Sequence, residues 1–162
     1  MTKLNLGCGL RKLDGWVNVD IADADVTCDI TLPLPFADES VDVVMAIHVL
    51  EHFYVWDAKT ILDQWLRVLK PGGVLILELP CLDKIVMMML EQVTNEGAVD
   101  FDLTMMGLYG NPGLQDPYMM HKWCYSAEWM DKLMSKLDVT KYRLEEPKFH
   151  KPERDMRWVA WK

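Results

Sequence analysis

The stretch from Lys3 to Asp20, which reads KLNLGCGLRKLDGWVNVD, constrains the fold more than any other part of the chain. Its first apolar residues, Leu4 and Leu6, predict a short β-strand that stops at the turn Gly7-Cys8-Gly9. A second strand pattern follows and stops at the carboxylate of Asp20. Glycines let a backbone approach a ligand closely, and an acid at this position can accept hydrogen bonds from ribose hydroxyls. The stretch therefore predicts one edge of a nucleoside pocket.

The connection between these two strands is short. Parallel neighbours normally need a crossover of about a dozen residues, usually a helix, yet part of the stretch from Gly9 to Asp20 is already strand. The first crossover helix is therefore predicted to be shortened or absent, with Asp14-Gly15 as the turn before the second strand. Arg11 and Lys12 stand where that helix would be, and either supply positive charge to a ligand or are two exposed basic residues.

The next part of the chain alternates strand and helix patterns. The nearly continuous apolar run Val41–Ile47 fits a strand buried on both faces of a parallel sheet. Apolar residues recur every three or four positions over Ala58–Leu69, which predicts a helix that ends at the Lys70–Gly73 stop signal. Val74–Leu79 is the next buried strand. This order predicts a mostly parallel α/β sheet with crossover helices.

The last part of the chain predicts a different pairing. Ser126 has the character of an N-cap for a helix that continues to Leu137. Two strand patterns follow, Val139–Leu144 and Met156–Trp161, without a helix between them, so an antiparallel pair is expected. Residues 1–162 then form a single domain. Residues 81–125, rich in methionine and interrupted by glycine and proline, are expected to be an insertion that serves as a substrate lid.

Composition excludes several classes of protein. The chain has 162 residues and a net charge of −8, which argues against binding nucleic acid in bulk. Its four cysteines form no C-x-x-C pair, and neither a secretory segment nor a membrane-spanning run is found, so a cytoplasmic protein with free thiols is expected. A C-terminal set of basic residues is interpreted as solvated surface: Lys148, Lys151, Arg154 and Arg157.

Four motifs together carry a resemblance to a known family. They are LNLGCG, GWVNVD, CDITLPLPFADESVDVVMAIHVLEHF and RVLKPGGVLILELP, and they cover Lys3–Pro80 in this order. The chain resembles the class I S-adenosylmethionine-dependent methyltransferases, and the HVLEHF signature resembles a small predicted-methyltransferase branch of them. The resemblance implies a Rossmann-like fold, S-adenosyl-L-methionine as the cofactor and transfer of its methyl group.

The resemblance also implies roles for single residues. His48 would lie near the sulfonium and its methyl group, or else be a structural histidine at a helix start. Asp29 would lie near the adenine amino group, or else cap a turn. The remaining cofactor contacts implied are Gly7, Cys8 and Gly9 at the methionine part, Asp20 at the ribose, and Ile21 and Ile30 at the two faces of the adenine, with Arg11 as a source of positive charge.

Methyl transfer to a hydroxyl or amine needs a group that removes a proton, and histidine titrates in the right range. His48 is the first candidate for this catalytic role and His121 the second. His48 and His52, four positions apart with Glu51 between them, have a spacing that can bind a metal, but a third ligand is missing nearby in sequence, so no metal is predicted. Phe36, Trp56 and Trp65 are expected in the core.

The acceptor and the oligomeric state cannot be read from the sequence. A small molecule such as a sugar or metabolite is expected as the acceptor. A nicotinamide-dependent oxidoreductase is disfavoured, because the third glycine of G-x-G-x-x-G is replaced by Lys12. A domain that binds the cofactor without catalysis, as a partner or regulatory subunit, is the main alternative. An ordered pocket formed with residues 81–125 would favour the enzyme.

Overall fold

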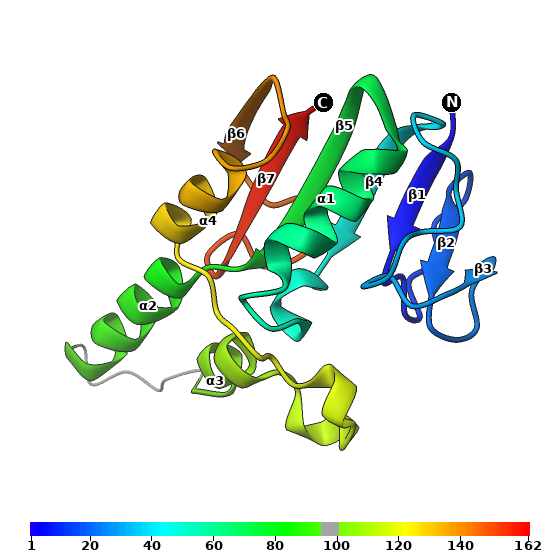
Figure 1. The fold of residues 1–162 in the computed structure, drawn as a ribbon. Helices are drawn as coiled ribbons and strands as arrows, with labels where there is room; N and C mark the ends of the chain where they lie inside the picture. The colour runs from blue at the N-terminus through cyan, green and yellow to red at the C-terminus, as the bar shows by residue number, and fades with distance from the viewer. Residues whose placement is uncertain (95–100) are drawn as a thin grey trace.

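The computed structural model describes residues 1–94 and 101–162 and contains one seven-stranded sheet in the order β3-β2-β1-β4-β5-β7-β6 (Figure 1). The strands β1 to β5 pair in parallel, whereas β7 runs antiparallel to both β5 and β6. The predicted mostly parallel sheet with an antiparallel C-terminal pair is therefore confirmed. The strands are β1 (Lys3–Leu6), β2 (Val17–Asp20), β3 (Val26–Thr27), β4 (Val41–Ile47), β5 (Leu69–Pro80), β6 (Lys141–Glu145) and β7 (Asp155–Trp161).

Helices α1 and α4 lie in front of the sheet in Figure 1, and α1 is the crossover between β4 and β5. The Oγ atom of Ser126 accepts a hydrogen bond of 3.1 Å from the backbone N–H of Trp129, which confirms the predicted N-cap of α4. The helical elements are α1 (Ala58–Val68), α2 (Leu82–Thr94), α3 (Phe101–Tyr109), α4 (Ala127–Met134) and the 3₁₀ turns η1 (Leu50–His52), η2 (Pro112–Leu114) and η3 (Pro117–Met119).

Between β1 and β2 the chain forms turns instead of a helix, as the short crossover predicts. Asn5 and Asn18 are register partners on these strands, and the Asn5 side-chain amide donates to the Asn18 side-chain oxygen at 3.0 Å. The same Asn5 amide donates to the carbonyl of Arg11, and the Asn18 oxygen also accepts from the N–H of Leu13 at 2.8 Å. Two buried asparagines thus satisfy backbone groups that a helix would satisfy internally.

Of the aromatic residues predicted in the core, two behave as expected. Trp65 is fully buried and its indole N–H donates to the carbonyl of Ile30 at 2.8 Å, while Phe36 packs against the core as a half-buried side chain. The prediction for Trp56 is wrong, because its side chain is 72% exposed. It precedes α1 in the connection from η1 and stacks on Tyr54, with the ring centroids 4.6 Å apart.

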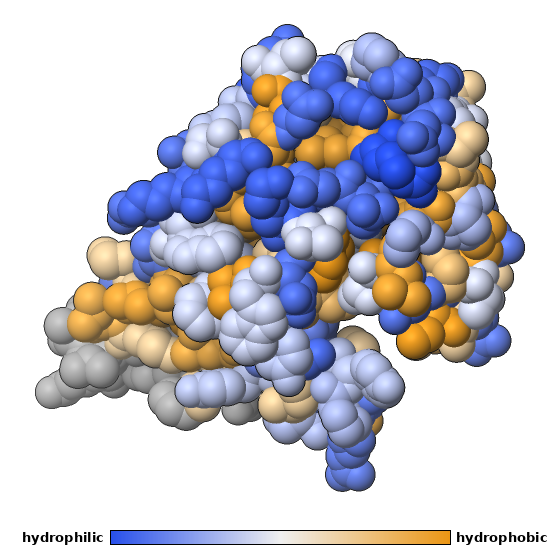
Figure 2. Space-filling view, in the orientation of Figure 1, coloured by the Kyte–Doolittle hydropathy of each residue, from blue (hydrophilic) through white to orange (hydrophobic). Residues whose placement is uncertain are grey.

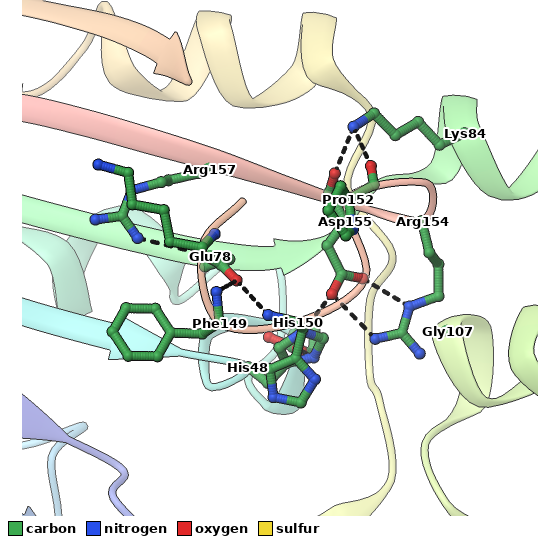
Figure 3. Close-up of polar contacts among 12 residues, drawn as sticks. His48, Glu78, Lys84, Gly107, Phe149, His150, Pro152, Arg154, Asp155 and Arg157 are labelled. Carbon is green, nitrogen blue, oxygen red and sulfur yellow. Dashed lines mark hydrogen bonds and ion pairs between the residues drawn. The ribbon is translucent and has the colours of Figure 1, made fainter. Parts of the chain in front are cut away.

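The loop between β6 and β7 is tied to β5 by one buried carboxylate, that of Glu78. Its two oxygens accept the backbone N–H groups of Lys148, Phe149 and His150, each at 2.9 Å (Figure 3). Arg157 donates to the same carboxylate at 3.0 Å. The interpretation of the C-terminal basic residues as solvated surface is therefore wrong for Arg157 and also for Arg154, which is buried beside Asp155.

Residues 81–125 leave the sheet and return to it at the same place. Cys81 and Tyr125 form a β-bridge, and the N–H of Leu82 donates to the Tyr125 carbonyl at 2.9 Å. The described part of this segment carries α2, α3, η2 and η3 below the sheet in Figure 1, and Figure 2 shows the surface hollowed between it and the β1–β3 side. Its position suits the expected lid, which stays a prediction.

Two exclusions from composition can be compared with the structure. Cys8, Cys28, Cys81 and Cys124 are all free cysteines. Among residues 1–94 and 101–162, no helix has both the length and the apolar character needed to cross a bilayer.

Candidate cofactor and acceptor site

The glycine turn after β1 has two glycines with different tasks. Gly7 and Gly9 both have positive φ, 63° and 49° respectively, a conformation that side chains rarely adopt. A Cβ atom on Gly7 would lie 2.5 Å from a methyl group of Val49, so Gly7 allows the chain after β4 to pack against the turn. A Cβ atom on Gly9 would meet nothing within 4 Å. Gly9 therefore faces open space, where a ligand can approach its backbone.

The carboxylate of Asp20 lies beside this turn. Its Oδ2 atom accepts the backbone N–H of Gly9 at 2.7 Å, and its Oδ1 atom accepts the N–H of Ile21 at 2.6 Å. Each carboxylate oxygen can accept more than one hydrogen bond, so both still have capacity for ribose hydroxyls. The Ile21 side chain is exposed at the same end of β2. The ends of β1 and β2 thus meet as the sequence predicts.

Other predicted cofactor residues have clear structural tasks as well. The carboxylate of Asp29 accepts hydrogen bonds from the N–H and the hydroxyl of Thr31, at 2.9 and 2.6 Å, so it caps a turn. Ile30 is buried in the core. Cys8 is buried too, and burial followed by the nearby Asp20 carboxylate raises the pKa of its thiol. Their contacts with the adenine and the methionine part stay predictions.

Arg11 is close to a residue from the opposite end of the chain. Its guanidinium lies 2.8 Å from the Nε2 atom of His150, in the loop between β6 and β7. Both residues line a small cavity of about 60 Å³ behind the glycine turn, together with Phe149. A loop from the C-terminal part of the chain therefore covers the region from which the first crossover helix is missing.

His48 follows β4 and lies between two buried acids. It has a positive φ of 55°, and its backbone N–H donates to the carbonyl of Glu78 at 2.7 Å. Its ring forms ion pairs at 2.8 Å from Nε2 to Asp155 and at 3.0 Å from Nδ1 to Glu51. Burial alone lowers the pKa of His48, but the interactions with Asp155 and Glu51 outweigh it and raise the pKa to about 9. At neutral pH both ring nitrogens are then protonated, which leaves no lone pair to accept a proton.

Asp155 joins this histidine to an arginine. Its carboxylate accepts hydrogen bonds from Nε and Nη2 of Arg154, at 2.6 and 3.1 Å, besides the one from His48 (Figure 3). Burial alone raises the pKa of Asp155, but the bonds from His48 and Arg154 lower it to about 2. The first residue of β7 and the residue after β4 are therefore linked by buried ionic contacts.

Sequence reasoning missed the importance of Glu51, whose side chain is only 1% exposed. Backbone N–H groups of Lys122 and Trp123 donate to the Glu51 carbonyl, at 2.8 and 3.3 Å, and bring the returning part of residues 81–125 against η1. As a result the Nε2 atom of His121 lies 3.9 Å from the Glu51 carboxylate. His52 also contacts the His121 ring, with centroids 4.8 Å apart. The signal in the sequence was the spacing of Glu51 and its two flanking histidines.

A larger cavity of about 300 Å³ opens between η1, the start of α1 and the returning segment. Lys122 forms one wall: its ammonium donates to the His52 carbonyl at 2.9 Å and lies 5.1 Å from the centroid of the Tyr54 ring. This volume is at the lower end of the range of small-molecule sites. The lining residues are Thr31, Phe53, Tyr54, Asp57, Thr60, Ile61 and Lys122.

Comparison with known proteins agrees with this geometry. Residues 4–77, which include β1, β2, β4 and most of β5, match the family model described as "Methyltransferase domain". A stretch of 47 residues is 45% identical to a protein of Mycolicibacterium smegmatis described as a "Probable S-adenosylmethionine-dependent methyltransferase". Over this part of its length the chain is similar to S-adenosylmethionine-dependent methyltransferases. The stretch covers 29% of this chain and only 18% of the mycobacterial protein.

Solved structures show that the methyltransferase fold extends over the whole chain. A protein from Pyrococcus horikoshii superposes with a TM-score of 0.65 at 16% identity, over 99% of this chain and 81% of that one. A methyltransferase from Methanosarcina mazei gives 0.63 at 16% identity, over 99% and 92%. A methyltransferase from Archaeoglobus fulgidus gives 0.61 at 17% identity, over 99% and 86%. At these identities the likeness concerns the fold.

S-adenosyl-L-methionine is the cofactor of this methyltransferase family, and the residues at the ends of β1 and β2 fit it. The open space beside Gly9 would admit the ligand, and the Asp20 carboxylate is held by two backbone N–H groups with capacity left for hydroxyls.

Proposed function

We propose that this methyltransferase transfers the methyl group of S-adenosyl-L-methionine to a small-molecule acceptor, such as a sugar or metabolite. The contact between Gly9 and Asp20 carries the proposal, because it joins an open glycine turn to a ribose-binding acid at the ends of adjacent parallel strands. The cavity between η1 and Lys122 supports a small acceptor, since segments that follow β3 and β4 in the chain line it.

In this proposal the predicted cofactor residues other than His48 keep their roles. Asp20 binds the ribose hydroxyls, and the turn Gly7-Cys8-Gly9 holds the methionine part. Arg11, with His150 beside it, places positive charge at the edge of the sheet. The adenine contacts proposed for the exposed end of β2 and the turn after β3 are Ile21, Asp29 and Ile30.

The cofactor supplies an electrophilic methyl group on a sulfonium. The protein's own work is then to align the acceptor and to remove its proton, and alignment alone contributes much of the rate. Of the two histidines predicted as proton acceptors, His121 is better supported, because its Nδ1 atom lies 3.0 Å from the Gly107 carbonyl and leaves Nε2 with a lone pair. Burial lowers the pKa of His121, which keeps it neutral. His48, with both nitrogens engaged, is better suited to position η1.

Calorimetric titration with S-adenosylmethionine and with S-adenosylhomocysteine tests the cofactor part. We expect micromolar binding to the wild type and a loss of about tenfold or more for Asp20→Asn, because a hydrogen bond to a charged group contributes about 1.5–3 kcal/mol. Asp14→Asn, on the exposed turn before β2, is the matched control and should bind as the wild type does.

No binding of either ligand would contradict the proposal. Binding followed by a screen of hydroxyl and amine acceptors without any turnover would favour the alternative, a domain that binds the cofactor and acts as a partner or regulatory subunit.

A further inference from the structure

Three buried atoms beside η1 lack the partners that buried polar atoms normally have. They are both carboxylate oxygens of Glu51 and the Nδ1 atom of His52, and none of them has a hydrogen-bond partner within residues 1–94 and 101–162. The ion pair of Glu51 with His48 brings charge to one side of the carboxylate without hydrogen-bond geometry. Such orphaned groups cost stability unless a water or an ion occupies the space between them.

The orientation of His121 points to an ion. The Nδ1 atom lies 3.0 Å from the Gly107 carbonyl, so this nitrogen carries the proton and donates it. The Nε2 atom then presents its lone pair toward Glu51, at 3.9 Å from Oε1. A histidine that binds a metal commonly donates its other ring N–H to a backbone carbonyl, which fixes the tautomer and the ring. The same Oε1 atom also forms the ion pair with the Nδ1 atom of His48, at 3.0 Å, which helps to hold the carboxylate in place.

The three side chains lie within reach of one cation. One oxygen of Glu51 and one nitrogen each of His52 and His121 lie within 4.8 Å of one another. Ligand atoms around a tetrahedral zinc ion are about 3.4 Å apart at bond lengths of about 2.1 Å, so small side-chain rotations close the site. Two imidazoles and one carboxylate form the ligand set of zinc sites that keep an open fourth position.

A second group of possible ligands does not share these properties. This group consists of His48, His150 and Asp155. Asp155 already accepts hydrogen bonds from His48 and from Arg154 (Figure 3). The guanidinium of Arg11 lies against His150. A cation there would have to displace an arginine. The cluster at η1 is different, because the Glu51 oxygens and the Nδ1 atom of His52 have no hydrogen-bond partner among the described residues, and the ion pair with His48 is the contact of the carboxylate.

We propose that Glu51, His52 and His121 bind one divalent transition-metal cation, with Zn²⁺ as the best match to their donor atoms. Imidazole nitrogens bind transition-metal cations more tightly than they bind Mg²⁺, which prefers oxygen ligands and water. The sequence leads to the opposite expectation, since the third ligand lies 69 positions away from His52 and arrives only with the returning segment. A Lys122 backbone contact to Glu51 sets its position.

The open position of the cation suggests the class of acceptor, and this step rests on the proposed methyl transfer. An acceptor hydroxyl bound to the cation would have a lower pKa, so it would release its proton to solvent water near neutral pH without a general base. Its oxygen would then form the bond to the methyl carbon as the bond from that carbon to the sulfonium breaks, and S-adenosylhomocysteine would leave. The Nε2 atom of His121 would then be a ligand instead of the proton acceptor. The site therefore favours an acceptor that carries a hydroxyl group.

Equilibrium dialysis with Zn²⁺ tests the site after the full chain has been treated with a chelator. We expect one Zn²⁺ per chain, and at least about tenfold weaker binding for Glu51→Gln and His121→Asn. His52→Asn, which changes a half-buried side chain, should show the same loss if either buried variant fails to fold. Mg²⁺ should not compete at equal concentration.

His150→Gln is the matched control, because it removes a histidine from the second cluster and leaves η1 intact. It should bind Zn²⁺ as the wild type does. Wild-type binding no tighter than that of His121→Asn, or a loss of binding in His150→Gln, would overturn the proposal.

The visible absorption of bound Co²⁺ gives a second readout without turnover. The wild type should show a spectrum of protein-bound Co²⁺ that His52→Asn loses, and an unchanged spectrum in this variant would contradict the ligand set. Because no cofactor is needed, Zn²⁺ binding without binding of S-adenosylmethionine would contradict the proposed function alone. Binding of S-adenosylmethionine by a chain that takes up no Zn²⁺ would contradict the metal site alone.

Discussion

The Nε2 atom of His48 lies 2.8 Å from a carboxylate oxygen of Asp155, 107 positions later in the chain. The contact joins the end of β4 to the start of β7 and holds His48 in a backbone conformation with positive φ. The contact therefore connects β4 and β7, which are separated by β5 in the sheet, at the edge where the candidate site lies.

Asp155→Asn should destabilise the fold. The variant leaves His48 and Arg154 without their shared charge, and breaking a buried ion pair costs about 3–5 kcal/mol. Urea unfolding measures the change. His48→Gln and the double variant complete a cycle, and a coupling energy near zero would contradict the link between β4 and β7.

Glu78→Ala should loosen the loop between β6 and β7. It removes the acceptor of three backbone N–H groups and the partner of Arg157. We expect a loss of about 3–5 kcal/mol, less for Glu78→Gln, which keeps one carbonyl oxygen. Hydrogen exchange at the backbone amides of residues 148–150 should be faster in Glu78→Ala than in the wild type. The exposed Glu146→Gln serves as the control, and equal exchange in all variants would disprove the anchoring role.

Stability should fall as the pH falls from 6.5 to 4, in part because of His150. Burial is the main cause that lowers the pKa of His150 from 6.5 to about 4, and the positive charges of His48 and Arg11 lower it further. Arg154 adds a smaller lowering, and the carboxylate of Asp155 partly opposes it. In this window the unfolded chain binds a proton that the folded chain does not, so unfolding is favoured. The pH dependence of the urea midpoint should be shallower in His150→Gln. An identical slope would exclude His150 as a source.

Trp65→Phe and Trp56→Phe should differ in their effect on stability. The first removes a buried indole and its hydrogen bond to Ile30, and we expect a loss of about 2 kcal/mol or more. The second changes a side chain that is 72% exposed, so the free energy of unfolding should stay within about 0.5 kcal/mol. Thermal unfolding compares them, and similar losses would contradict the exposed position of Trp56.

Gly7→Ala and Gly9→Ala should separate a structural glycine from a ligand-binding one. Both force alanine into a positive φ, which costs about 1–2 kcal/mol, but only Gly7→Ala adds a clash with Val49. Gly7→Ala should therefore lower the melting temperature more. Gly9→Ala should fold and bind S-adenosylmethionine more weakly, and unchanged affinity would show that the ligand does not approach Gly9.

Much of the fold follows from local patterns. The strands before Gly7 and after Gly15, the buried run of β4, helix α1 and the C-terminal strand pair are all predicted within a few residues, because periodicity and turn residues act over short distances. The glycine turn and Asp20 are found for the same reason, since each stands directly at the end of its strand. The exposure of Trp56 is not predicted, because composition gives a residue's preference for the core and not the path of a connection.

The sequence by itself determined most of the strands, helix α1 and the meeting of Gly9 with Asp20, since parallel strands bring their carboxyl ends to one edge of a sheet. Only the tertiary structure decided which distant side chains share the interior. It placed Asp155 against His48, Glu78 beneath the loop of residues 148–150, and His121 beside Glu51. Buried charges need partners wherever the chain can supply them, and the packing of segments far apart in sequence determines which partners they find.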